Sequence, residues 1–95
     1  MKTGIELIAE ERQEQIEKHN RTIESDIKNN GAFQLSKAAA ALIHPDFRTA
    51  KDRFRVMPNE WDDLITLKMC RKSYEDRLVI AGALIAAEID RINSL

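Results

Sequence analysis

The sequence predicts an all-α protein: a compact bundle of three to four helices with a long C-terminal helix. Apolar residues recur at the helical period of 3.6 residues in several segments, and the longest of these spans 74–92. No segment alternates apolar and polar residues over a useful strand length. A chain of 95 residues can build one modest core, so we expect residues 1–95 to form a single helical domain.

The composition argues against several classes of function. The chain has 15 Lys and Arg against 16 Asp and Glu, and its net charge of −1 gives no general attraction to nucleic acid or to a membrane surface. No apolar run approaches the roughly 20 residues of a membrane span, and the N-terminal residues lack the apolar core of a signal peptide. The single Cys70 cannot form an internal disulfide, and we interpret it as an inert thiol rather than a nucleophile. We expect a cytoplasmic protein with neither a membrane nor a nucleic-acid partner.

The first helix is predicted over residues 5–20. One face carries residues that recur at helical spacing: Ile5, Ile8, Arg12, Ile16 and His19. Glutamates crowd the other faces, where they either meet solvent or point inward as ligands. Arg12 stands between two isoleucines, so its stem can cover apolar surface while its guanidinium seeks an acid.

Two segments follow with opposite tendencies. Residues 20–31 are rich in turn formers and end in Asn-Asn-Gly31, which predicts an irregular connection. A second helix is expected over 32–43. It must stop before Pro45, because the residue preceding a proline resists the helical conformation.

The segment 45–60 is open to two interpretations. Basic and aromatic side chains alternate in it, as in stretches that bind a phosphate or a nucleic acid. We prefer a surface loop whose phenylalanines touch the core, because the run is short and also carries acids. Asn59 is then predicted to cap a short helix that breaks near Lys72-Ser73.

The C-terminal helix is predicted over Tyr74–Ile92, with Ser73 as the residue that caps its first turn. Its apolar residues form one stripe: Leu78, Ala81, Leu84, Ile85, Ile89 and Ile92. Gly82 lowers helix propensity, which indicates a packing role for this small residue. Glu88 lies within the stripe, and burying an acid alone is costly, so it is either paired or functional. We expect an ion pair with Arg12, the alternative being a metal ligand.

Carboxylates on helices form the one chemical pattern in the sequence. Glu11 and Glu14 are three residues apart, share a helix face and belong to an EExxE motif. Hard cations such as Mg²⁺ take oxygen ligands, and acids from two helices can hold them against a di- or triphosphate. The sequence contains no P-loop, no glycine-rich dinucleotide loop and no zinc-ligand spacing.

Several segments together resemble a family of small phage and bacterial all-α proteins. Its "ERxRQI…GWTPEHDD" opening is similar to residues 11–16 followed by Thr22, Glu24 and Asp26. Its "GELxxAA" segment is similar to Gly31 and residues 35–39. Its "WD…WK…LVKAGALIxAEIxRL" ending is similar to Trp61-Asp62, Lys68 and residues 77–92, among which AGALIAAEIDRI is the most specific match.

That family is distantly similar to the MazG-like nucleoside triphosphate pyrophosphohydrolases, which are Mg²⁺-dependent and oligomeric. The resemblance implies cleavage of a nucleoside triphosphate to monophosphate and pyrophosphate. It also implies a set of Mg²⁺-facing acids: Glu11, Glu14, Asp26 and Glu88. Lys37 or Lys68 would contact phosphate, and no catalytic residue is assigned.

A second function stays open beside the enzyme. Gln34 and Ile27 stand where the family pattern has acids. These departures favour a non-catalytic, phage- or prophage-derived helical interaction protein that acts as a homo-oligomer. For a chain this short we expect a homodimer, with Val79 and Ile80 as interface residues.

Overall fold

The computed structural model describes residues 1–19 and 22–95 of the protein. Within these ranges the chain forms helices and no strand: α1 (Gly4–His19), α2 (Ile23–Asn29), α3 (Gln34–Ile43), α4 (Ala50–Arg55), α5 (Asp63–Cys70) and α6 (Tyr74–Asn93). The all-α prediction is confirmed, whereas the expected count of three to four helices is wrong, because the described residues form six. None of these helices has the length and apolar character required to cross a membrane.

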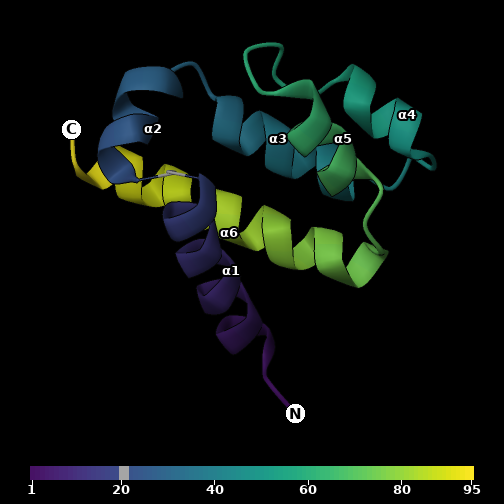
Figure 1. Ribbon diagram of the computed structural model, residues 1–95, viewed down its shortest axis with the longest axis horizontal. Helices are drawn as coiled ribbons and strands as arrows, with labels where there is room; N and C mark the ends of the chain where they lie inside the picture. The colour runs from purple at the N-terminus through teal and green to yellow at the C-terminus, as the bar shows by residue number, and fades with distance from the viewer. Residues whose placement is uncertain (20–21) are drawn as a thin grey trace.

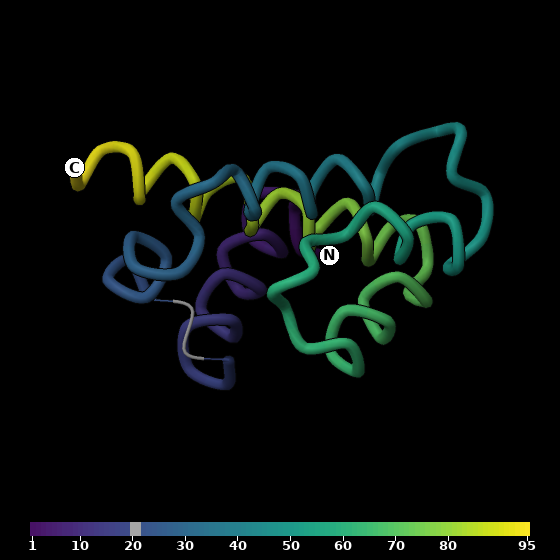
Figure 2. The backbone as a smooth tube through the Cα atoms, turned by 90° about the horizontal axis from the view of Figure 1, so that it is seen from above, coloured from purple at the N-terminus to yellow at the C-terminus, as the bar shows by residue number. Residues whose placement is uncertain are grey.

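The helix α6 is the central element of the fold (Figure 1). It contacts α1, α2, α3 and α5, and its most extensive contact is with α3. The helices α4 and α5 pack on each other at the far end of α3 from α2 (Figures 1 and 2). The N-terminal end of α1 extends beyond the other helices (Figure 1), which leaves Ile5 83% exposed.

Local signals explain where α3 and α6 begin or end. Ser73 caps α6, since its hydroxyl oxygen accepts a hydrogen bond from the backbone N–H of Asp76 at 3.2 Å. The helix α3 ends at Ile43, and His44 has the extended conformation expected for a residue that precedes proline. These boundaries agree with the sequence predictions.

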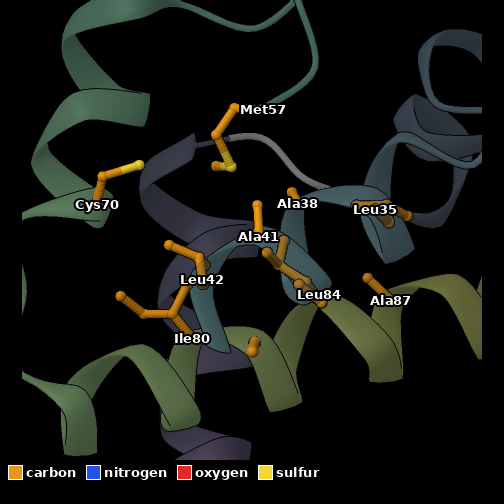
Figure 3. Packing of buried hydrophobic residues seen from close by; sticks show 11 residues of the cluster. Leu35, Ala38, Ala41, Leu42, Met57, Cys70, Ile80, Leu84 and Ala87 are labelled. Carbon is orange, nitrogen blue, oxygen red and sulfur yellow. The ribbon is translucent and has the colours of Figure 1, made fainter. Parts of the chain in front are cut away.

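The core lies between α3 and α6 and is thin because alanines line it (Figure 3). Leu35, Leu42 and Leu84 are fully buried, and small residues fill the space between them: Ala38, Ala39, Ala41, Ala81 and Ala87. Small side chains let the two helices approach closely. Small residues therefore line both helices where they meet in the core.

The predicted apolar stripe of α6 is only partly correct. Ala81 and Leu84 are buried, whereas the larger residues Leu78, Ile85, Ile89 and Ile92 are 40%, 44%, 52% and 53% exposed. The buried face is rotated toward alanines and three charged residues: Arg77, Glu88 and Arg91. Because α3 lies close to α6, only small side chains of α6 fit between the two helices. The larger side chains therefore lie on the outer side of α6.

Gly82 has the predicted packing role, with α1 as the neighbour. A methyl group added at Gly82 would lie 2.6 Å from Cδ1 and 2.9 Å from Cγ1 of Ile8. Such distances are too short for real carbon contacts, so the isoleucine of α1 occupies the space that glycine leaves open. This contact sets where α1 crosses α6.

The segment 20–31 is not an irregular connection, because it contains α2. Thr22 caps this helix by accepting a hydrogen bond from the backbone N–H of Ser25 at 3.1 Å. Asp26 and Asn30 are buried. These polar residues, which suggested turns in the sequence, are therefore part of the packed interior. The predicted end of the first helix at residue 20 lies outside the described residues, as does Arg21.

The prediction of a surface loop over 45–60 is also wrong for the centre of this segment, which forms the helix α4. Thr49 caps α4 by accepting from the backbone N–H of Asp52, and Arg53 and Met57 are buried against the rest of the molecule. The next helix, α5, begins later than predicted. Its cap is Asp62, whose carboxylate accepts from the backbone N–H of Ile65 at 3.0 Å, and not Asn59.

Candidate functional site

Four polar residues are buried where α2 meets the second half of α6: Asp26, Asn30, Glu88 and Arg91. We refer to these four as the polar cluster. Arg91 donates a hydrogen bond from Nε to Glu88 Oε1 at 2.6 Å. This bond, together with the negative charges of Glu88 and Asp26, raises the pKa of the Arg91 guanidinium above its usual value. Arg91 is thus held by acids from two helices.

Asn30 connects the polar cluster to the segment before α5. Its Nδ2 donates to Asp26 Oδ1 at 2.8 Å, and its Oδ1 accepts from Trp61 Nε1 at 2.9 Å. A single amide thereby fixes an indole ring relative to a fully buried carboxylate. Sequence reasoning missed Asn30 and Arg91. For Arg91 a signal was present, since it follows Glu88 by three residues, the spacing of neighbours on a helix.

The predicted ion pair between Arg12 and Glu88 does not form. Arg12 Nη2 lies 3.6 Å from Asp90 Oδ2, and Glu88 pairs with Arg91 instead. The reason is the position of α1, which crosses α6 on the side of Gly82 and Asp90 rather than over Glu88. The expectation that Glu88 is buried and paired is correct, but its partner is on the same helix.

Each of the four predicted metal-binding acids has a partner three or four residues further along its own helix or at that helix's C-cap. Glu11 Oε2 accepts from Gln15 Nε2, Glu14 Oε1 from Lys18, Asp26 from Asn30 and Glu88 from Arg91. Within residues 1–19 and 22–95, no three His, Cys, Asp or Glu side chains gather closely enough to share a metal ion. The magnesium site stays a prediction based on the resemblance.

Burial shifts the pKa of Glu11. The pKa of Glu11 is raised, chiefly because the carboxylate is partly removed from water, with a further contribution from the negative charge of Glu14. The hydrogen bond from Gln15 opposes this shift. Glu11 and Glu14 are therefore close enough to interact, as their spacing predicts.

The predicted phosphate-binding lysines lie apart from the polar cluster. Lys37 on α3 and Lys68 on α5 are both exposed. Cys70 is fully buried, and its burial raises the pKa of the thiol, which is consistent with an inert residue.

A groove of about 740 Å³ opens beside the polar cluster. Three elements line it: the C-terminal end of α1, the helix α2 and the start of α5. Lys18 and Lys28 contribute basic groups to it, Glu60 and Asp62 contribute acidic ones, and Trp61 contributes its indole ring. Thr66 also lines the groove, and its buried Oγ1 has no hydrogen-bond partner among the described residues. The indole and the hydroxyl can contact a planar polar ligand, and the charges of the two lysines and the two acids balance. Three separate segments build the groove, so no spacing in the sequence could have revealed it.

Comparisons with known proteins identify no relative of this chain. No family model, no curated protein and no solved structure matches it. The resemblance to the phage family and to the MazG-like enzymes therefore stays a prediction.

Proposed function

We propose that the protein is a helical interaction protein that pairs with a second copy of itself through α6. The observation that supports this proposal is a row of half-exposed apolar side chains, which we name the α6 strip: Leu78, Ile85, Ile89 and Ile92. Their spacings of seven, four and three residues keep them on one side of the helix, as in the seam of a coiled coil. Four large apolar residues aligned in this way favour an interface over scattered surface exposure.

Three residues of the α6 strip fit a second copy because they are placed symmetrically along the helix. Leu78 and Ile92 each lie seven residues from Ile85. A two-fold axis through Ile85 would set two α6 helices antiparallel, with Leu78 of one copy against Ile92 of the other. Next to the strip, Ala81 is buried in the core and Gly82 is covered by Ile8 of α1, so neither position places a charge against the contact.

The energy of such a contact is appreciable for a small protein. Full burial of a leucine or isoleucine side chain is worth about 1.5–3 kcal/mol, and each residue of the α6 strip would gain part of that. The predicted interface residue Ile80 does not belong to the strip, because it is only 7% exposed and lies in the core. The α6 strip replaces it as the proposed interface.

Sedimentation equilibrium at tens of micromolar tests the proposal. We expect a dimer for the natural chain and a monomer for Ile85→Asp, because a carboxylate at the axis would face its own copy. Leu64→Asp is the matched control, since Leu64 is 80% exposed on α5 and lies outside the strip. A monomeric natural chain, or a Leu64→Asp variant that dissociates as readily as Ile85→Asp, would contradict the proposal.

A second candidate function is the nucleotide pyrophosphohydrolase, and the groove beside Trp61 is the observation that favours it. The lysines Lys18 and Lys28 can contact phosphates while the indole stacks on a base. The test is thermal unfolding with a panel of nucleoside triphosphates, with and without Mg²⁺ or Mn²⁺, beside an assay for released pyrophosphate. Binding that is lost in Lys28→Ala, together with metal-dependent turnover, would support the enzyme. The absence of both at millimolar ligand would exclude it.

A further inference from the structure

Two arginines are buried at the other end of α6 without an acidic partner. Arg53 on α4 is 8% exposed and Arg77 on α6 is 9% exposed. In the described part of the chain neither one forms an ion pair, and both donate only to backbone carbonyls. Arg53 donates from Nη1 to the carbonyl of Cys70 at 3.0 Å, and Arg77 donates from Nη1 to the carbonyl of Leu42 at 2.6 Å. A buried positive charge without a counter-charge is normally costly.

The two guanidinium groups also act on each other. The pKa of Arg77 is lowered, first by burial and then by the positive charge of Arg53. Burial raises the pKa of the Cys70 thiol, so Cys70 supplies no negative charge beside Arg77. The arginines therefore concentrate positive charge in one place, which would favour binding of an anion.

Hydrogen bonds to backbone carbonyls do not satisfy every donor of the two buried arginines. Each arginine fixes the C-terminal end of a helix, α5 in one case and α3 in the other, which explains some of its donors. Arg53 Nε, however, is buried and has no hydrogen-bond partner among the described residues. A buried donor left without an acceptor costs free energy, so the protein's own groups do not fully satisfy the Arg53 guanidinium.

A hollow large enough for a small anion lies beside the arginines. This hollow of about 420 Å³ is lined by Arg48, Arg53 and Arg77, and none of its lining residues is acidic. Aromatic rings form its rim: His44 stacks on Phe47 with ring centroids 4.5 Å apart, and the Tyr74 ring lies 5.5 Å from the Arg77 guanidinium carbon. The hollow thus combines three guanidinium groups with flat apolar surfaces.

We propose that this hollow binds the phosphate group of a small phosphomonoester. Guanidinium groups are planar forks that match tetrahedral oxyanions with two donors at once, and burial strengthens such charge-assisted bonds. The rings of Phe47 and Tyr74 would cover the organic part of the ligand. The site is separate from the polar cluster and from the α6 strip, so it depends on neither function proposed above.

Nuclear magnetic resonance with the whole chain tests this inference, using inorganic phosphate and phenyl phosphate as probes. We expect saturable shifts of the side-chain Nε–H signals of Arg53 and Arg77 with both probes. We also expect a melting temperature above that in chloride of equal ionic strength. Phenyl phosphate should bind at least as tightly as inorganic phosphate, because its ring can contact the aromatic rim.

Two exposed arginines supply a matched pair of variants. Arg48→Ala removes a guanidinium from the hollow and should weaken phosphate binding about tenfold, the size of one charge-assisted hydrogen bond. Arg55→Ala removes an exposed arginine of α4 outside the hollow and should leave binding unchanged. Non-saturable shifts, equal weakening by both variants, or binding of a short oligonucleotide without binding of either probe would overturn the proposal.

Discussion

Glu88 and Arg91 form a buried ion pair within α6, with Arg91 Nε 2.6 Å from Glu88 Oε1. Both side chains face the packed side of the helix, where Asp26 of α2 adds a second negative charge near the arginine. The pair therefore joins two helices through charge, although its hydrogen bond lies within one of them.

Removing the carboxylate should be costly. We expect Glu88→Ala to lower the free energy of unfolding by about 3 kcal/mol, because a buried charge loses its partner. Glu88→Gln should cost less, since its amide oxygen can still accept the hydrogen bond. Denaturant unfolding measures the free energy of unfolding of both variants. The difference between them reports the contribution of the negative charge of Glu88.

Double-mutant cycles decide which arginine is coupled to Glu88. The cycle of Glu88→Ala with Arg91→Ala should give a clear interaction energy, and the cycle with Arg12→Ala should give one near zero. The opposite result would mean that α1 approaches Glu88 in solution and that the observed crossing of α1 over α6 is wrong.

Gly82→Ala should destabilise the protein by about 1–2 kcal/mol, because the added methyl would overlap Ile8 of α1. In an Ile8→Ala background the same substitution should become stabilising by up to about 1 kcal/mol, since alanine favours a helix more than glycine does. Thermal or urea unfolding of the four variants checks this change of sign. If Gly82→Ala has the same effect in both backgrounds, the contact with Ile8 is not what constrains Gly82.

Phe33 has a left-handed backbone conformation, with φ of 67°, directly before α3, and its side chain is 70% exposed. This conformation costs a residue with a side chain about 1 kcal/mol, so Phe33→Gly should raise the free energy of unfolding by up to that amount. Gly31→Ala is a useful comparison, because Gly31 does not have a positive φ and an added methyl would meet only Ile27 O at 3.7 Å. It should be neutral or slightly stabilising. A destabilised Phe33→Gly would show that the ring makes an important contact.

Glu11 should make stability depend on pH. Its pKa is raised in the folded state, so the folded state binds this proton more tightly than the unfolded state does. Stability from this group is therefore highest below the ordinary carboxyl pKa of 4.5 and falls as the pH rises through the raised value. Glu11→Gln should stabilise the protein at neutral pH and leave it unchanged near pH 4. Unfolding measured across this range tests the sign, and an equal effect of the variant at both pH values would contradict it.

Local signals in the sequence were enough to predict the boundaries of α6 and the end of α3. Ser73 and Pro45 act on their immediate neighbours, so no tertiary information is needed. The helices α2 and α4 were not predicted, because local signals are not enough to identify them. Their caps, Thr22 and Thr49, lie in polar stretches that also favour turns, and only packing against other helices makes such short segments helical.

The inward face of α6 and the partners of its charged residues could not be predicted from periodicity. Hydrophobicity alone predicted that Leu78, Ile85 and Ile89 face the core. In the structure alanines face it instead, because their small side chains let α3 approach. The partner of Glu88 depended on where α1 crosses, which the contact of Ile8 with Gly82 fixes. The burial of Arg53 and Arg77 likewise depends on contacts between residues that are far apart in the chain.

Cysteine cross-linking at Ile85 tests most directly the claim that α6 pairs with a second copy. On a two-fold axis the two thiols introduced by Ile85→Cys would face each other within disulfide reach. The buried Cys70 would not compete, and Leu64→Cys provides an exposed control on α5. We predict rapid formation of a covalent dimer by Ile85→Cys under mild oxidation, with little by Leu64→Cys or the natural chain. Cross-linking of Ile85→Cys no faster than that of Leu64→Cys would contradict the pairing of α6.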